Sequence, residues 1–189
     1  MLKDQREPKS MPNAIFRAMN IMMDVQDFPF PTQIEKRVKN FGIADGMTVV
    51  DYGCGTGRYT VCFSKLVHEK GQVYAVDIHE LAISAVKKRI EKQRIRNVKT
   101  ILANGYHTEI PERIAHRVAA IDMFFLVPHA APFLEEIHRI TKEDGLLIID
   151  DGHQSRKKTK ERIGLSNLWQ IVEETPDHLK CRPKSASGK

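Results

Sequence analysis

A glycine-rich turn is the part of this chain with the clearest chemical meaning. Residues 49–57 read Val-Val-Asp-Tyr-Gly-Cys-Gly-Thr-Gly, so a β-branched run ends in an acidic residue and three glycines follow at alternate positions. A strand that turns through glycines into a helix brings unpaired backbone N–H groups close to a ligand. The helix dipole favours a negative charge at that point. The turn therefore predicts a site for a nucleotide-like ligand with an anionic end.

The glycine spacing narrows the choice of nucleotide. A dinucleotide fingerprint, G-x-G-x-x-G, would need its third glycine at Arg58 or Thr60. A phosphate-binding P-loop would need Gly-Lys-Ser/Thr after the turn, and none follows. The pattern that stands here, D-x-G-x-G-x-G, resembles motif I of the class I S-adenosylmethionine (SAM)-dependent methyltransferases. This resemblance implies SAM as the cofactor and S-adenosylhomocysteine (SAH) as its product.

A second carboxylate supports the resemblance. The run Val-Tyr-Ala-Val-Asp-Ile at 73–78 indicates another buried strand, and it ends at Asp77. A carboxylate at the tip of the second strand can accept hydrogen bonds from both ribose hydroxyls. The alternative is that Asp77 only caps the helix that starts near His79 and Glu80. Together with the glycine turn, the pattern favours the cofactor role.

The resemblance assigns further residues to the cofactor. Gly53 and Gly55 would lie against the methionine end, and Asp51 would fix the turn or contact the ammonium through water. The family often has an acidic residue after strand three for the adenine amine, where this chain has Asn104, whose amide oxygen can still accept the bond. The candidate cofactor residues are Asp51, Tyr52, Gly53, Gly55, Asp77, Ile78 (on adenine), Asn104, Gly105 and Leu126 (through its backbone).

Three polar residues near the ends of later strands are candidates for catalysis. His129 follows the fourth predicted strand, and Asp151 and His153 follow the fifth. In an open parallel sheet, ligands bind outside the carboxyl ends of the strands, so these residues would face the methyl acceptor. A histidine could remove a proton from the acceptor, and Asp151 could orient His153 or bind a cation. The alternative is ordinary loop polarity, with Asp151 helping to cap the next helix.

The apolar residues alternate between strand-like and helix-like spacing, which is typical of an α/β fold with a parallel sheet. The predicted strands are 48–52, 72–77, 98–103, 121–127 and 146–150, followed by a hairpin at 168–174 and 178–182. The predicted helices are 58–70, 79–95, 131–142 and 154–164. A final antiparallel hairpin resembles the Rossmann-like methyltransferase fold: a seven-stranded sheet of order 3-2-1-4-5-7-6, with strand 7 reversed and helices on both faces.

The chain divides into three predicted segments. Residues 1–31 form an N-terminal arm with an amphipathic helix, in which apolar residues recur at helical spacing between Ile15 and Met23. This helix either covers the cofactor as a lid or pads the sheet. Residues 32–183 form the SAM-dependent methyltransferase domain, and 184–189 form a flexible basic tail.

Composition sets limits on the remaining functions. The 189 residues suit one domain, and no apolar run is long enough to span a bilayer. Three cysteines without a C-x-x-C spacing fit a reducing cytoplasm, and the eight histidines show no metal-binding pair. The net charge of +6 is moderate, and its basic clusters have no interleaved aromatic residues, which favours solvated helix faces over a nucleic-acid surface.

The sequence argues against one class of methyl acceptor, the exocyclic amines of nucleic-acid bases. Methylases of exocyclic base amines typically carry Asn/Asp-Pro-Pro-aromatic after strand four, where this chain reads Leu-Val-Pro-His at 126–129. The overall pattern is closest to small, stand-alone methyltransferases, and we expect an unidentified small-molecule acceptor. Two alternatives stay open: an RNA or protein methyltransferase, and a SAM-binding protein without catalysis.

Overall fold

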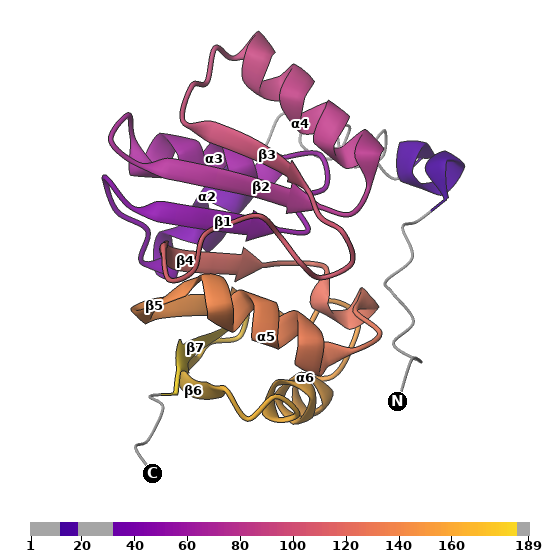
Figure 1. Cartoon of the computed structure of the whole chain (residues 1–189), viewed down its shortest axis with the longest axis vertical. Helices are drawn as coiled ribbons and strands as arrows, with labels where there is room; N and C mark the ends of the chain where they lie inside the picture. The colour runs from indigo at the N-terminus through magenta and orange to yellow at the C-terminus, as the bar shows by residue number, and fades with distance from the viewer. Residues whose placement is uncertain (1–11, 19–31, 185–189) are drawn as a thin grey trace.

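A seven-stranded sheet forms the centre of the computed structural model, which describes residues 12–18 and 32–184 (Figure 1). Its order is β3-β2-β1-β4-β5-β7-β6. Strands β1 to β5 run parallel, and β7 is antiparallel to both β5 and β6. The strands are β1 (Thr48–Tyr52), β2 (Gln72–Asp77), β3 (Val98–Leu102), β4 (Ala115–Ala120), β5 (Thr141–Ile149), β6 (Trp169–Glu174) and β7 (Leu179–Pro183). The predicted fold and its reversed strand are confirmed.

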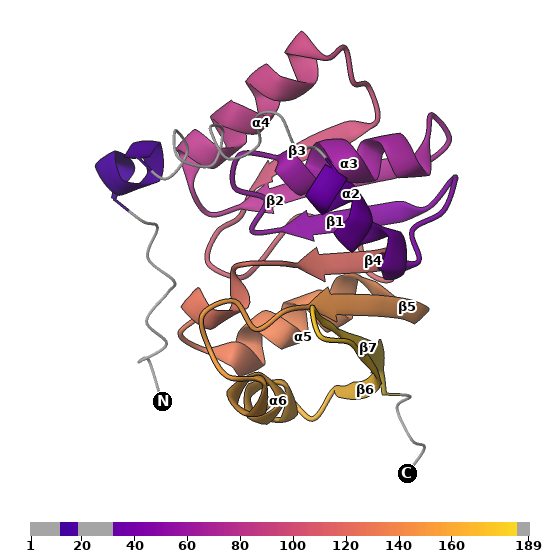
Figure 2. The ribbon, with the colours of Figure 1, turned by 180° about the vertical axis from the view of Figure 1, so that it is seen from behind.

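Helices cover both faces of this sheet. In Figure 1, α5 lies in front, whereas Figure 2 shows α2 and α3 on the opposite face. Their bounds are α2 (Thr32–Val38), η1 (Lys39–Phe41), α3 (Arg58–Val67), α4 (Glu80–Lys92), η2 (Phe124–Leu126), α5 (Ala130–Ile140) and α6 (Arg156–Gly164). Two separate apolar clusters result, because neighbouring strand residues point to opposite faces. The α5 cluster includes Phe133 and Leu134 of that helix, and the α3 cluster includes Phe63 and Val67. In β1, for example, Val50 belongs to the α5 cluster and Val49 to the α3 cluster.

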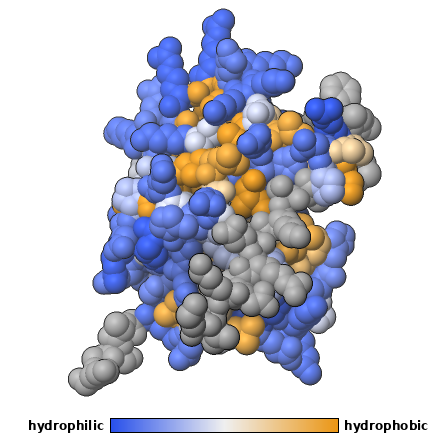
Figure 3. All heavy atoms as spheres, turned by 45° about the vertical axis from the view of Figure 1, so that its right-hand side comes forward, coloured by the Kyte–Doolittle hydropathy of each residue, from blue (hydrophilic) through white to orange (hydrophobic). Residues whose placement is uncertain are grey.

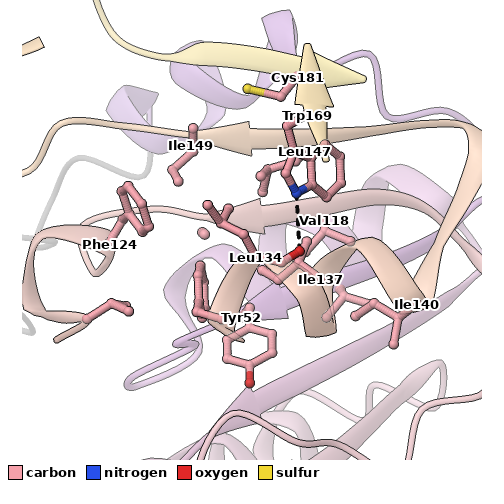
Figure 4. Packing of buried hydrophobic residues seen from close by; sticks show 14 of the residues in the cluster. Tyr52, Val118, Phe124, Leu134, Ile137, Ile140, Leu147, Ile149, Trp169 and Cys181 are labelled. Atoms are coloured by element: carbon pink, nitrogen blue, oxygen red, sulfur yellow. Dashed lines mark hydrogen bonds between the residues drawn. The ribbon is translucent and has the colours of Figure 1, made fainter. Parts of the chain in front are cut away.

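The α5 cluster also anchors the C-terminal hairpin. Trp169 of β6 is 4% exposed, and its indole Nε1–H donates to the carbonyl of Leu134 at 3.1 Å (Figure 4). A buried indole N–H needs such an acceptor, since an unpaired one would cost about 1–3 kcal/mol. Cys181 of β7 is fully buried beside it in the same cluster. The antiparallel hairpin therefore closes the sheet as part of its core.

The predicted position of strand four is wrong. We expected a strand over 121–127, but β4 spans Ala115–Ala120, and residues 124–126 form the 3-10 helix η2. The sequence His116-Arg117 and three alanines give β4 a weak strand pattern. Helices cover this central strand on both faces, so small side chains suit its packing. The more apolar residues that follow form a loop and the short helix η2, in which Phe124 is fully buried.

The N-terminal arm is described only in part. Residues 13–18 are helical, and α2 begins at Thr32. The predicted amphipathic helix continues to Met23, but Met19, Met22 and Met23 lie outside the described residues. The tail prediction also falls outside, apart from Lys184. Within the described parts, no helix is both long enough and apolar enough to cross a membrane.

Candidate functional site

The carboxyl ends of β1 to β5 lie along one edge of the sheet, which we call the carboxyl edge. In Figure 1 the arrowheads of β1 to β3 point to the right, and this side comes forward in Figure 3. There, hydrophobic side chains interrupt a mostly hydrophilic surface. Leu102 at the end of β3 is 49% exposed, and Leu126 is 59% exposed. The edge therefore offers both apolar surface and the polar groups described below.

The glycine turn is pinned to the neighbouring strand by its backbone. The N–H groups of Gly53 and Cys54 both donate to the carbonyl of Val76 in β2, at 2.8 and 2.9 Å. The turn then leads into α3 through Gly57. Because the donors of the turn are tied to the end of β2, the glycines and the β2 tip form one rigid unit.

Gly55 and Gly57 have left-handed backbones but different surroundings. Gly57 has φ +81°, and a Cβ there would meet Val86 of α4 at 2.9 Å, so its missing side chain allows helix packing. Gly55 has φ +50°, and a Cβ there would meet nothing within 4 Å. The open side of Gly55 is thus the place in the turn where a ligand can approach the backbone.

Asp77 joins the turn to the start of α4. Its Oδ2 accepts from the backbone N–H of Gly55 at 2.9 Å, and its Oδ1 accepts from the N–H of His79, also at 2.9 Å. Burial raises the pKa of Asp77, and these two donors oppose that rise. A carboxylate offers about four lone pairs, so each oxygen keeps acceptor capacity for a ligand. The two roles predicted for Asp77 are therefore compatible. It fixes the start of α4, and its remaining lone pairs can still accept hydrogen bonds from the hydroxyls of a diol.

Asp51 is buried beneath the turn. It is 3% exposed, and the hydroxyl of Thr60 in α3 donates to its Oδ2 at 2.5 Å. Burial raises the pKa of Asp51 to about 7, against the lowering effect of the Thr60 hydrogen bond. This geometry supports the first of the two predicted roles, in which Asp51 fixes the turn.

Tyr52 belongs to the support of the site. Its ring is 3% exposed and packs edge-on against Phe133, and its hydroxyl donates to the carbonyl of Tyr106 at 2.5 Å. The hydroxyl of Tyr106 in turn accepts from the backbone N–H of His129 at 3.1 Å. Tyr52 thus holds the loop after β3, and that loop holds the start of α5.

The predicted adenine-side residues lie together after β2 and β3. Ile78 is half-buried against the α5 cluster. Asn104 is exposed, and its backbone exchanges hydrogen bonds with His107 at 3.2 and 3.1 Å. Gly105 has φ +62° with no atom near its Cβ position, so this tight loop leaves open space. The structure therefore brings these three residues to the carboxyl edge.

Leu126 lies farther from the sheet than predicted, because β4 ends at Ala120 and Leu126 belongs to η2. Arg162 of α6, which sequence reasoning missed, holds this segment. Its guanidinium donates to the carbonyl of Phe124 at 2.8 Å and to that of Val127, and it lies 4.4 Å from the Phe124 ring centre. Nothing in the polar helix pattern of 154–164 distinguished Arg162 from its neighbours.

The three catalytic candidates reach the carboxyl edge but do not form a linked set. His129 is the residue before α5, and His153 is exposed, with its ring edge-on to Phe125 at 4.8 Å. Asp151 accepts from Nε of Arg156 through both oxygens, at 3.0 and 2.8 Å. The cap of α6 is Ser155. Asp151 therefore pairs with an arginine of this chain, and its two hydrogen bonds to that arginine neither orient His153 nor cap α6.

A polar network at the tips of β4 and β5 also escaped sequence reasoning. Arg37 of α2 donates to Asp150 at 2.6 Å and to the Tyr59 hydroxyl at 2.7 Å, and pairs with Asp122 at 3.4 Å. Burial and the proximity of Asp122 raise the pKa of Asp150 to about 7. Arg37 stands 85 and 113 positions from its acidic partners, so no local pattern could reveal the contact.

Over the described ranges, no group of three His, Cys, Asp or Glu side chains is placed to hold a metal ion.

Comparisons with known proteins agree with this fold. The family model described as "Methyltransferase domain" matches residues 43–185. Demethylmenaquinone methyltransferase of Geobacillus stearothermophilus is 25% identical over 111 residues, covering 59% of this chain and 47% of that protein. Ribosomal protein L11 methyltransferase of Anoxybacillus flavithermus is 28% identical over 142 residues, covering 75% of this chain and 42% of that protein. The chain spans about half the length of the curated relatives it matches.

Two solved structures share the fold at low identity. A SAM-dependent methyltransferase from Aquifex aeolicus superposes with a TM-score of 0.71 at 22% identity, covering 85% of this chain and 95% of that chain. Geranyl diphosphate C-methyltransferase from Streptomyces coelicolor, solved with SAH, gives a TM-score of 0.63 at 20% identity. The match covers 77% of this chain and 63% of that chain. These likenesses extend over most of the sheet and establish the fold.

Asp51 makes the stability of the protein depend on pH. Its pKa is about 7 when folded and near 3.8 otherwise, so the folded state holds an extra proton between these values. The free energy of unfolding should therefore fall as pH rises from about 4 to about 7. In Asp51→Asn the side-chain oxygen still accepts from Thr60 but no longer titrates, so we expect a flatter profile.

Urea unfolding followed by Trp169 fluorescence gives the free energy of unfolding at about pH 5 and about pH 8. The change between these pH values should be larger in the wild type than in Asp51→Asn. Equal pH dependence in the wild type and Asp51→Asn would show that this carboxyl group titrates normally.

Proposed function

The chain belongs to the methyltransferase domain family of class I SAM-dependent enzymes, and from that premise we propose that it transfers the methyl group of SAM to a small-molecule acceptor. Family membership confirms the resemblance that the glycine turn suggested, and with it SAM as the cofactor. The proposal concerns the acceptor and the residues that bind each ligand.

The residues of the carboxyl edge fit SAM. The observation that carries the proposal is the Asp77 carboxylate, held at the tip of β2 by Gly55 and His79 and with lone pairs to spare. A ribose diol can donate one hydrogen bond to each of its oxygens. The open side of Gly55 gives the methionine end of the ligand access to the turn. At the same edge, Ile78, Asn104 and Gly105 are the residues that we assign to the adenine.

Bound SAM supplies a methyl group that its sulfonium already activates, so the protein contributes mainly position and exclusion of water. Asp77 and the glycine turn orient the donor. On the acceptor side, the ring of Phe125 and the exposed Leu126 offer apolar contacts beside His129 and His153. Either histidine could take a proton from a hydroxyl, thiol or amine acceptor. Apolar and aromatic surface with a few polar groups suits a small organic acceptor.

A second candidate function is methylation of a protein or an RNA. The similarity to ribosomal protein L11 methyltransferase, which covers 75% of this chain, favours it, as do the exposed lysines of α4. Binding of tRNA or rRNA at increasing salt separates RNA from the other acceptors, since a protein that contacts phosphates loses affinity steeply. A SAM-binding protein without catalysis would transfer no methyl group to any acceptor screened. For its compartment, we infer the cytoplasm from the three free cysteines.

Asp77→Ala should weaken SAH binding by about 1–3 kcal/mol, which is roughly 5- to 150-fold in Kd, because it removes charge-assisted hydrogen bonds to the ribose. Gly55→Val should weaken binding further, because its side chain fills the open side of the turn at φ +50°. Calorimetry with SAH measures both, and NAD should not bind with comparable affinity.

The controls are Glu80→Ala, which removes an exposed carboxylate near Asp77, and Gly46→Val, which strains another open glycine at φ +76° outside the site. Both should bind SAH as the wild type does. Normal SAH affinity in a folded Asp77→Ala protein would contradict the assignment of the ribose contact.

The catalytic proposal is tested on the acceptor side. His129→Ala and His153→Ala should keep SAH affinity and lose methyl transfer to an acceptor found by screening metabolite extracts. His68→Asn is the matched control, since His68 is exposed at the end of α3 that lies away from the glycine turn. Full turnover in both alanine variants would leave positioning alone as the mechanism.

A further inference from the structure

Phe16 is buried within an otherwise exposed N-terminal stretch. Its side chain is 3% exposed, whereas the adjacent Ile15 is 56% exposed and Arg17 is also exposed. The stretch lies beside the N-terminal end of α4 in both Figure 1 and Figure 2. A phenylalanine buried alone in this way indicates that residues 12–18 dock on the domain through one aromatic anchor.

The surface beneath Phe16 is the ring of His79. The two rings stack with their centres 4.3 Å apart and their planes at 26°. His79 is itself 5% exposed and is the N-cap residue of α4. Its Nδ1 accepts from the backbone N–H of Leu81 at 3.1 Å, so the ring is held by the first turn of the helix. The anchor therefore rests on a side chain whose position is already fixed.

His79 connects this anchor to the predicted ribose site. Its backbone N–H donates to Oδ1 of Asp77 at 2.9 Å, while Gly55 occupies Oδ2. A shift of His79 would therefore turn the carboxylate that we assign to the ribose. Phe16 contacts His79, and His79 in turn contacts Asp77. These contacts link the N-terminal stretch to the residue that we assign to the ribose.

We propose that Phe16 is a positioning residue for SAM, and that docking of the N-terminal stretch and binding of the cofactor strengthen each other through His79. The proposal rests on the assignment of Asp77 to the ribose. It favours the lid over simple padding as the role of this stretch, because padding has no reason to respond to the cofactor. By linkage, the factor by which docking raises SAM affinity equals the factor by which SAM favours docking.

The first experiment measures SAH affinity by calorimetry in the full chain. Phe16→Ala should raise the Kd for SAH by about 5- to 30-fold, within the range usual for coupled sites. Phe16→Tyr keeps the stacked ring and should restore most of the affinity. Ile15→Ala is the matched control: it removes an apolar side chain from the same stretch, but an exposed one, and should change the Kd less than about twofold.

The second experiment tests the reverse direction. Hydrogen exchange of the backbone amides at 13–18 should slow when SAH is added to the wild type. The same addition should give little protection in Asp77→Ala at an SAH concentration that saturates this variant, because the link to His79 is cut. Trp169 fluorescence confirms that each variant is folded.

The outcomes separate this inference from the proposed function. If the wild type binds SAH, Asp77→Ala weakens binding and Phe16→Ala does not, the coupling is overturned while the cofactor site stands. Protection of 13–18 that is equal in the wild type and Asp77→Ala would also overturn it. If the wild type fails to bind SAH, both proposals fall together.

Discussion

The site depends on one carboxylate that accepts two backbone hydrogen bonds. Asp77 holds the N–H of Gly55 on one oxygen and the N–H of His79 on the other, so the glycine turn, the tip of β2 and the start of α4 share a single fixed point. Burial opposes its ionisation, and the two donors offset part of that cost. A carboxylate oriented in this way is prepared for a diol before the ligand arrives.

Two further buried carboxylates organise the remaining strand tips. Asp51 anchors α3 through Thr60, and Asp150 ties α2 to the tips of β4 and β5 through Arg37. Burial raises the pKa of each to about 7, so ionising either one in the folded protein has an energetic cost. Their arrangement along one edge fits the general pattern in which functional sites hold groups with perturbed pKa values. The carboxyl edge is thus held by polar contacts, and the faces of the sheet by apolar packing.

Sequence reasoning succeeded where a local pattern carried the structure. β1 and β2 are rich in valine and carry Asp51 and Asp77 at or next to their last residue, and their bounds were predicted correctly. It failed at β4, because an alanine-rich strand covered on both faces has no alternation and weak propensity. Arg37 and Arg162 were missed because their partners lie far away in the chain. The pairing of Asp151 with Arg156 was missed for a different reason: the two are five residues apart, but their contact depends on the loop after β5.

The central claim is that the carboxyl edge binds SAM through Asp77 and the glycine turn. A crystal structure of the protein with SAH tests this most directly. The account predicts that both ribose hydroxyls donate to the Asp77 carboxylate and that the methionine portion lies on the open side of Gly55. A complex in which the ribose hydroxyls bind other groups, or in which SAH lies away from the carboxyl edge, would contradict it.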